Sequence, residues 1–279
     1  WDGAHQDNPL ILTLAHDSRK VEPGTLFVCL PGATVDGHAF AAAAVANGAV
    51  AVLAQREVEV GDKVPVIVTP DVRQAVERIA PWFYREPSAQ LRMIGVTGTN
   101  GKTTTTHIIR SILNLAGQPC GVSGTLHTLI GDRVISVKNT TPDVLDLQST
   151  LRDMADSGMR AVAMEVSSHA LALGRVAGCE FDTAVFTNMT QDHLDFHQTM
   201  ENYRDAKALL FRWLADDNSR KGNKAAVANI DDPAGEYMLA QTSARRISYG
   251  LSEQADLRAV DIDLRPEGSR FRVTGQWGG

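Results

Sequence analysis

The sequence has little cysteine and no long basic or apolar run. Its 279 residues include only three cysteines, Cys29, Cys120 and Cys179, which lie far apart and form no C-x-x-C pair. A disulfide framework or a zinc knuckle is therefore not expected, and a reduced cytoplasm fits. Lys plus Arg number 27 against 33 Asp plus Glu, a formal net charge of −6. This balance argues against nucleic acid as a partner.

The apolar residues do not predict a membrane span. The most apolar window, residues 39–54, is interrupted by Asn47-Gly48 and reads as a helix followed by a buried strand. The start of the chain has no basic segment followed by an apolar core, so no signal peptide is visible. We expect a cytoplasmic protein. Because the chain begins at Trp1 rather than Met and stops just after a strand-like run, we also expect a fragment.

What the sequence does contain is an alternation of strand and helix patterns, which predicts two α/β domains. Polar, proline-containing residues 85–90 look like a hinge between them. In the second domain, buried apolar runs follow helical or loop segments, which indicates a mostly parallel sheet covered on both faces. The expected helices are 38–47, 72–84, one directly after residue 101, one opened by residues 141–143, and 200–213; the expected strands are 24–30, 49–54, 64–68, 91–96, 161–166, 183–187 and 225–230.

The most informative segment is Gly98–Thr104, which follows an apolar strand and opens a helix. Glycines let the backbone approach phosphate oxygens, the helix N-terminus attracts the anion, Lys102 reaches the outer phosphates and the Thr103 hydroxyl can face Mg²⁺. The strict pattern G-x-x-x-x-G-K-[ST] fails at its first glycine, where Val96 stands. The alternative is a glycine-rich turn that merely starts a helix, but such a turn needs no Lys-Thr pair at its exit.

Two further positions, Glu165 and His193, are candidates for metal chemistry, and a third, Lys207, is not one from its sequence alone. Glu165 ends a buried strand where open α/β sheets bind ligands, so it is a magnesium-ligand candidate; a carboxylate that caps the next turn is the alternative. His193 lies in a segment with two histidines and two aspartates, but zinc spacing is lacking and its role stays open. Lys207, on an expected amphipathic helix, would by itself be read as a surface charge.

Together these segments resemble the Mur ligases of peptidoglycan synthesis. The resemblance spans nearly the whole chain and rests on TGTNGKTTTT, EVSSHAL, TNMTQDHLDFH and YRDAK, at residues 97–106, 165–171, 187–197 and 203–207. Residues 17–27 and 36–40 look like the family's UDP-sugar domain. The resemblance implies a small N-terminal α/β domain over residues 1–87 that binds the UDP substrate. A P-loop-type central domain over residues 88–279 would bind ATP and be truncated at its C-terminal end.

The resemblance also implies roles for individual residues. Lys102 would stabilise the transferring γ-phosphoryl group, and Lys207 would be carbamylated to become a magnesium ligand. The ATP-binding residues would be Gly98, Thr99, Asn100, Gly101, Lys102, Thr103 and Thr104, and Mg²⁺ would be held by Thr103, Glu165, His193 and Lys207. The substrate would be bound by Ser18, Ala33, Thr34 and Val35 at its uridine end, and by Asn139, Thr140, Thr141, Ser167 and Arg175 at its sugar, phosphate and peptide parts.

The activity implied is ATP-dependent ligation through an acyl phosphate. EVSSHAL and the pair Thr140-Thr141 point to the family member that adds a free amino acid, as the third residue, to UDP-N-acetylmuramoyl-L-alanyl-D-glutamate. Family members continue into a third domain that this chain lacks, so we expect weak substrate binding without complete ligation, and a monomer when complete. Lysine and diaminopimelate cannot be distinguished as the added residue. The alternatives are a folylpolyglutamate synthetase-like ligase and a non-catalytic nucleotide-sugar-binding fragment or subunit.

Overall fold

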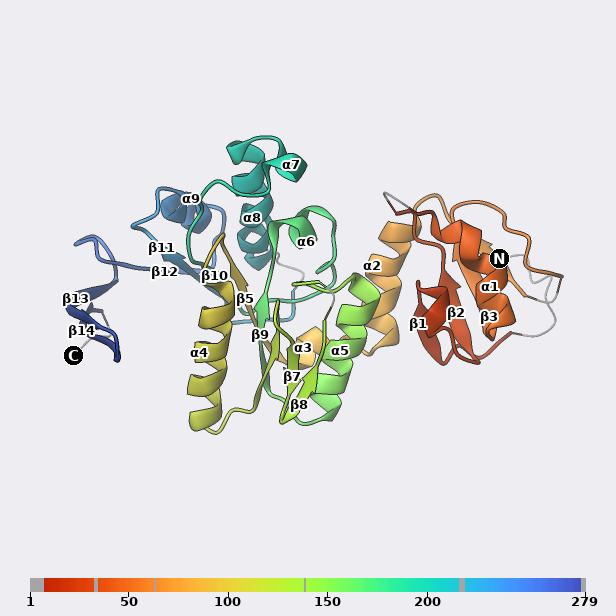
Figure 1. Cartoon of the computed structure of the whole chain (residues 1–279), viewed down its shortest axis with the longest axis horizontal. Coiled ribbons are helices and arrows are strands. Elements are labelled where there is room, and N and C mark those ends of the chain that lie inside the picture. The colour runs from red at the N-terminus through yellow and green to blue at the C-terminus, as the bar shows by residue number, and fades with distance from the viewer. Residues whose placement is uncertain (1–7, 33–34, 63, 138, 216–218, 277–279) are drawn as a thin grey trace. The chain divides into compact units, whose positions relative to one another are not determined.

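The computed structural model describes residues 8–32, 35–62, 64–137, 139–215 and 219–276 (Figure 1). Contacts within the chain divide it into two compact units, Trp1–Arg85 and Glu86–Gly279. Arg85 and Glu86, on either side of the division, have left-handed backbones with φ of 60° and 50°. Residues with a Cβ rarely adopt this conformation, so neither helix nor strand continues across the division. Among the described residues, no helix combines the length and apolarity needed to cross a bilayer.

The first unit is a four-stranded parallel sheet with its strands in chain order. Its core packs Phe27 and Val52 of the sheet against Ala44 of a short helix. The strands are β1 (Thr13–Ala15), β2 (Thr25–Val28), β3 (Ala49–Ala54) and β4 (Val66–Val68), and the helices are the 3₁₀ turns η1 (Ser18–Lys20) and η2 (Gly37–Phe40), α1 (Ala41–Ala46) and α2 (Val72–Phe83). The helix expected over 38–47 is thus a 3₁₀ turn followed by α1, and β1 is an additional strand.

A hydrogen-bonded histidine fixes the turn after β2. The Nδ1–H of His38 donates to Asp36 Oδ1 at 2.6 Å, and the Gln55 backbone N–H donates to His38 Nε2 at 2.9 Å. Since Gln55 N–H can only donate, the ring proton must lie on Nδ1. Arg56 also pairs with Asp36, and these two partners hold the pKa of Asp36 well below its usual range. The turn that begins at η2 is therefore fastened to the end of β3.

The second unit is built on a ten-stranded mixed sheet. Its order is β14-β13-β12-β11-β10-β5-β9-β6-β7-β8, and the six strands from β12 to β6 are parallel. The mostly parallel α/β fold predicted from the sequence is confirmed. The strands are β5 (Arg92–Thr97), β6 (Cys120–Ser123), β7 (Thr128–Ile130), β8 (Arg133–Ile135), β9 (Ala161–Glu165), β10 (Thr183–Phe186), β11 (Ala225–Asn229), β12 (Arg245–Gly250), β13 (Leu257–Arg265) and β14 (Gly268–Gly275).

Helices pack on both faces of this sheet. On one face, Ile109 and Leu113 of α4 cover residues of β5, β6 and β9. On the other face, Leu147, Leu210 and Met238 belong to one large apolar cluster. The helices are α3 (Pro87–Gln90), α4 (Lys102–Leu115), α5 (Val144–Asp156), α6 (Ser168–Ala172), α7 (Leu194–His197), α8 (Met200–Leu214) and α9 (Ala234–Ala240).

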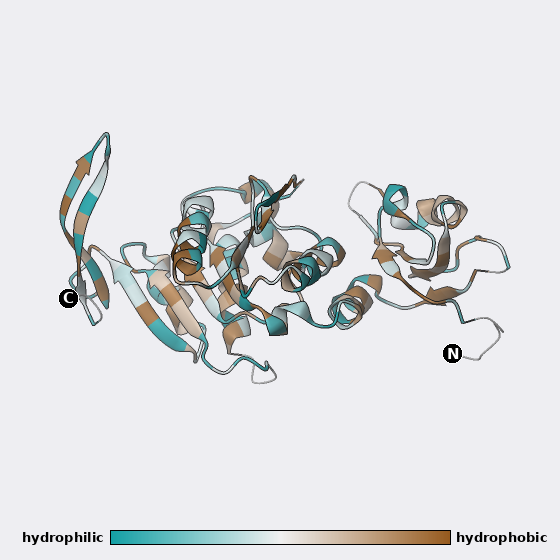
Figure 2. Cartoon of the chain, turned by 90° about the horizontal axis from the view of Figure 1, so that it is seen from below, coloured by the Kyte–Doolittle hydropathy of each residue, from teal (hydrophilic) through white to brown (hydrophobic). Residues whose placement is uncertain are grey.

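Two segments differ from the sequence expectation. Residues 87–90, part of the expected hinge, form α3, in which Pro87 takes the first helical position that suits its fixed φ. The Ser88 hydroxyl donates to Gly178 O, so α3 belongs to the second unit. Near the C-terminal end, β13 and β14 form a mostly exposed antiparallel hairpin in which apolar and polar residues alternate (Figure 2). The sequence analysis noted a strand-like run just before residue 277 but gave no strand bounds here and expected no hairpin.

Candidate functional site

The candidate site lies at the carboxyl edge of the parallel strands in the second unit. Strand β5 has β10 on one side and β9 on the other. The segment Gly98–Thr104, which the sequence predicts to bind phosphate and which is called the phosphate loop below, follows β5. Ser167 follows β9 and Asn188 follows β10. The carboxyl ends of parallel strands meet at one edge, which is where ligands of open α/β sheets bind. The fold thus brings three of the sequence motifs to one edge.

The phosphate loop is pressed against the segment after β10. Gly98 has φ +148°, and a Cβ at this position would lie 1.9 Å from Thr187 Oγ1. Any side chain at residue 98 would therefore clash with Thr187. The Thr187 hydroxyl donates to Asn100 O at 2.7 Å. Close approach between these two segments requires the glycine at position 98.

Asn188 and Asn100 bind each other and shape the loop. Asn100 N–H donates to Asn188 Oδ1 at 3.0 Å, and Asn188 Nδ2 donates to Asn100 O at 3.1 Å. The Thr99 N–H donates to Asn188 O at 2.8 Å. Within the described residues, the backbone N–H groups of residues 101–104, at the start of α4, have no acceptor. These are the orphan donors of a helix N-terminus, which suit phosphate oxygens.

Lys102 folds back over the loop that precedes it. Its Nζ donates to Gly98 O and to Thr99 O, both at 2.8 Å. Burial lowers the pKa of Lys102, while Glu165 and Asp192 act in the opposite direction. The ammonium group is held at the loop by two carbonyl oxygens, which a phosphate can replace as the stronger, charge-assisted partner.

Thr103 and Glu165, two of the expected magnesium ligands, are joined by a hydrogen bond. Glu165 is 1% exposed. Its Oε1 accepts hydrogen bonds from Thr103 Oγ1 and from Thr125 N, each at 2.9 Å, and its Oε2 accepts from Thr125 Oγ1 at 3.0 Å. Among the described residues this buried carboxylate forms no ion pair. A buried carboxylate beside a hydroxyl is an oxygen donor set that fits Mg²⁺.

The Glu165 carboxylate occupies the space that a side chain at Gly124 would fill. A Cβ on Gly124 would lie 2.1 Å from Glu165 Oε1, so Gly124→Ala must displace the carboxylate. We expect the variant to bind a Mg²⁺–nucleotide about tenfold more weakly, as for the loss of one bond to a charged group. Calorimetric titration at fixed nucleotide and varied Mg²⁺ measures this.

The matched control is Gly222→Ala, because a Cβ on Gly222 meets nothing within 4 Å. It should bind the Mg²⁺–nucleotide as the unchanged chain does. Equal affinities for the Gly124 and Gly222 variants would contradict a metal role for Glu165.

Three histidines gather beside this edge. The ring centroids of His169 and His193 are 4.7 Å apart, and those of His169 and His197 are 5.4 Å apart. His193 has a left-handed backbone with φ 52°, and its Nε2 lies 3.3 Å from Asp192 Oδ2. Asp192 is therefore the carboxylate beside this imidazole. Across the part of the chain that the structure describes, no group of three His, Cys, Asp or Glu side chains could by itself hold a metal ion.

Lys207 is not the surface charge that an isolated lysine suggests. It is 1% exposed, and its Nζ lies 4.1 Å from the centroid of the Tyr203 ring. Burial, together with the charge of Lys102, lowers the pKa of Lys207 to about 7, against the weaker opposing effect of Asp192. A buried lysine of this kind is partly neutral near pH 7, and a neutral amine is a nucleophile.

The remaining expected residues fall into two groups. In the second unit, the hydroxyl oxygens of Thr140 and Thr125 lie 3.1 Å apart, the Thr141 hydroxyl donates to Glu165 O at 2.9 Å, and Arg175 pairs with Asp143 at 3.0 Å. Ser167 N–H donates to Thr141 Oγ1, and Asn139 is exposed. In the first unit, Ser18 begins η1 and Val35 is 56% exposed. Ala33 and Thr34 lie outside the described residues.

The structure adds three residues that the sequence analysis did not assign to the site: Thr125, Asn188 and Tyr203. Each binds an assigned residue, but the partners are 40, 88 and 104 positions apart in the sequence. A signal existed for two of them. Thr125 follows a glycine after a buried strand, and Tyr203 precedes Lys207 by four residues, one helical turn.

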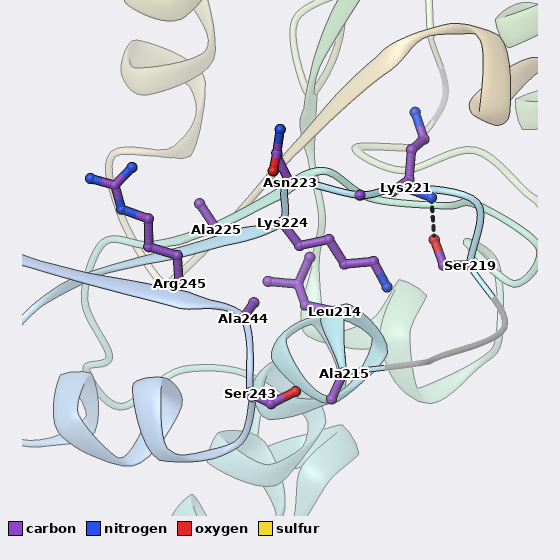
Figure 3. A pocket seen from close by; sticks show the side chains of 11 residues that line it. Leu214, Ala215, Ser219, Lys221, Asn223, Lys224, Ala225, Ser243, Ala244 and Arg245 are labelled. Carbon is purple, nitrogen blue, oxygen red and sulfur yellow. Dashed lines mark hydrogen bonds between the residues drawn. The ribbon is translucent and has the colours of Figure 1, made fainter.

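A separate depression of about 770 Å³ lies at the amino ends of β11 and β12, away from the candidate site (Figure 3). Two cationic residues, Lys224 and Arg245, line it together with several alanine and serine residues. The Lys221 N–H donates to Ser219 Oγ there. None of the candidate site residues contributes to its lining. The strands of this sheet thus carry the depression at one end and the phosphate loop at the other.

The fold and the site together define a two-unit α/β protein with a phosphate-binding type of loop at the edge of a parallel sheet. Residues 96–278 match the family model described as the Mur ligase middle domain, and residues 11–84 match the model described as the Mur ligase family, catalytic domain. The chain belongs to the Mur ligase family, which confirms the resemblance of its motifs.

Curated relatives carry the name UDP-N-acetylmuramoyl-L-alanyl-D-glutamate–2,6-diaminopimelate ligase. One from Geobacillus thermodenitrificans is 52% identical over 266 residues, which covers 95% of this chain and 54% of the relative. One from Listeria monocytogenes serovar 1/2a is 47% identical over 258 residues, covering 92% and 52%. The chain therefore spans about half the length of the curated relatives it matches.

Solved structures agree with these matches. One of a ligase with that name superposes with a TM-score of 0.79 at 35% identity, covering 96% of this chain and 54% of the other. A MurF ligase from Thermotoga maritima, solved in complex with ADP, gives 0.66 at 21% identity. A Mycobacterium tuberculosis folylpolyglutamate synthase gives 0.52 at 14% identity. The last two likenesses concern the fold alone.

Proposed function

We propose that this chain is the substrate- and ATP-binding part of a ligase that extends UDP-N-acetylmuramoyl-L-alanyl-D-glutamate by a third amino acid. The observation that carries the proposal is the buried Glu165 carboxylate, which binds Thr103 beside the phosphate loop and forms no ion pair among the described residues. The relatives' names favour 2,6-diaminopimelate as the added amino acid. The whole protein would act in peptidoglycan synthesis.

Each part of the phosphate-loop region has a role in this proposal. The N–H groups of residues 101–104 bind the ATP phosphates, and Lys102 neutralises charge on the γ-phosphoryl group. Thr103 and Glu165 would hold Mg²⁺ through oxygen, with His193 and carbamylated Lys207 as further ligands. Mg²⁺ would supply charge neutralisation between the phosphates.

The reaction would proceed in two displacements. A carboxylate oxygen of the substrate's terminal D-glutamate attacks the γ-phosphorus, the bond to the bridging oxygen breaks, and ADP leaves with its electron pair. The amine of the incoming amino acid then attacks the acyl phosphate and loses a proton, and inorganic phosphate leaves as the amide forms. The chain's own residues hold the phosphates and neutralise charge, which is most of what phosphoryl transfer requires.

Carbamylation of Lys207 would turn a buried cation into a metal ligand. The neutral amine attacks CO₂, a C–N bond forms, and one proton is released to give a carbamate. Burial of Lys207 without an ion-pair partner among the described residues supports this step, because it favours the neutral amine. The carbamate oxygens would add to the hard donor set of Thr103 and Glu165.

The residues proposed to bind the UDP-sugar substrate form one group in each unit. Ser18 and residues 33–35 would bind the uridine end. Asn139, Thr140, Thr141, Ser167 and Arg175 would bind the sugar, phosphate and peptide parts. Arg175 suits this role because a guanidinium binds phosphate or carboxylate through two parallel hydrogen bonds.

Calorimetric titration tests the proposed substrate directly. It measures binding rather than ligation, because the chain spans only about half the length of its curated relatives. UDP-N-acetylmuramoyl-L-alanyl-D-glutamate is the ligand, and the same molecule without D-glutamate is the control. We expect selective binding of the form that carries D-glutamate. If neither binds while ATP–Mg²⁺ does, the UDP-sugar assignment is wrong. Binding of a folate with ATP would instead favour the folylpolyglutamate synthetase alternative.

A further inference from the structure

Tyr203 lies between the phosphate loop and Lys207, and no role has been assigned to it above. It sits in the first turn of α8, whose N-cap is Thr199, and is 1% exposed. Its hydroxyl lies 3.1 Å from Thr99 Oγ1, in the phosphate loop. Its ring lies under Lys207, one helical turn further along α8. One side chain therefore contacts both elements that would face the nucleotide.

The hydrogen bonds of Thr99 settle which oxygen donates. Thr190 N–H donates to Thr99 Oγ1 at 3.0 Å, and the Thr99 hydroxyl lies 3.2 Å from Thr190 O. Thr190 O can only accept, so it takes the one proton of the Thr99 hydroxyl. The Tyr203 hydroxyl must then be the donor to Thr99. The hydrogen bond between Tyr203 and Thr99 connects the loop to α8, and the hydrogen bond between Asn188 and Asn100 connects the loop to the segment after β10.

The aromatic ring of Tyr203 packs against the Lys207 ammonium group. The Nζ lies 4.1 Å from the ring centroid, within the range of a cation–π interaction. The rings of His197 and His193 pack against Tyr203 with centroid distances of 5.1 Å and 6.1 Å. The ring is therefore held in one orientation, and it fixes where the Lys207 side chain can lie.

We propose that Tyr203 is a positioning residue that joins the phosphate loop to α8 and so sets the separation between the loop and Lys207. The inference rests on the proposed function, because it gives Tyr203 a role in nucleotide binding. A residue that only filled the core would need its ring but not its hydroxyl. The Tyr203 hydroxyl therefore distinguishes the two roles.

The test compares two Tyr→Phe variants in the whole chain. Tyr203→Phe keeps the ring and removes the bond to Thr99. The control is Tyr237→Phe, which removes a hydroxyl that donates to Asp205 Oδ1 at 2.7 Å, on the α8–α9 side of the unit. Calorimetry with Mg²⁺ and a non-hydrolysable ATP analogue gives the nucleotide affinity, and thermal unfolding gives the stability of each variant.

We expect Tyr203→Phe to weaken nucleotide binding about three- to tenfold, the effect of one hydrogen bond, and Tyr237→Phe to leave it unchanged. Adding Tyr203→Phe to a Thr99→Val chain should cause no further loss, because the shared bond is already absent. Equal nucleotide affinity for the unchanged chain and Tyr203→Phe would overturn the inference while leaving the proposed function intact. Failure of the unchanged chain to bind the analogue would overturn both.

Discussion

Lys102→Ala is expected to reduce nucleotide binding and ATP turnover more than any other single change in this chain. Lys102 is the side chain that caps the loop, with its Nζ 2.8 Å from both Gly98 O and Thr99 O. Loss of a cation aimed at a transferring phosphoryl group typically reduces the rate about 10²- to 10³-fold. Calorimetry with the ATP analogue and phosphate release from ATP measure the two effects.

The control for Lys102 is Lys224→Ala. Lys224 belongs to the same unit but lines the depression at the opposite ends of the strands. It should leave nucleotide binding unchanged, and both variants should bind the UDP-sugar substrate normally. If Lys102→Ala keeps full affinity and turnover, the loop is not a phosphate site and the ligase proposal fails.

The phosphate loop was predictable although its first glycine is missing. At the position where the strict pattern requires glycine, Val96 is fully buried in β5 and pairs with Val185 on one side and Glu165 on the other. The strand therefore continues through this residue, and the tight turn begins only at Gly98. Strand, turn and helix follow from local patterns, which is why the sequence predicts this part of the site well.

The partners of the loop could not be predicted in the same way. Thr99 binds Thr190 and Tyr203, which depends on how α8 packs under the sheet. Lys207 has the sequence neighbours of a surface lysine, and only this packing buries it. Without the family resemblance, the sequence would have left Lys207 out of the site altogether.

The order of the strands in the second unit's sheet could not be predicted from the sequence, for a related reason. Apolar runs between helices predict parallel strands, and the six central strands are parallel. That β9 is inserted between β5 and β6 depends on which face each connecting helix covers, and no local pattern encodes it. The insertion matters because it brings Glu165 next to the phosphate loop.

Lys207→Met is expected to stabilise the chain while impairing its metal site. The unfolded lysine has a pKa near 10.5, and in the folded chain its pKa is lowered to about 7. Between these values the unfolded state binds more protons, so stability rises with pH in this window and is lost as the pH falls from 10.5 towards 7. At pH 7 the buried cation costs on the order of 2–4 kcal/mol. Methionine fills a similar volume without the charge.

Unfolding between pH 7 and 10 in CO₂-free buffer measures this prediction, and a partly buried lysine, Lys221, provides the control. Lys221 is paired, with its Nζ 2.9 Å from Asp182 Oδ2, so Lys221→Met should destabilise the chain by leaving that carboxylate without its cation. Destabilisation by Lys207→Met as well would mean that the cation–π contact with Tyr203 outweighs the cost of burying the ammonium.

Adding bicarbonate and Mg²⁺ tests whether Lys207 is present as an ammonium or as the proposed carbamate. If Lys207 becomes a carbamate that binds Mg²⁺, adding both should raise the unfolding midpoint of the unchanged chain, since a ligand that binds only the folded state stabilises it. The Lys207→Met chain has no amine to react and should not respond. An equal response from both chains would rule out Lys207 as the carbamylated residue, because the added stability would then come from another site.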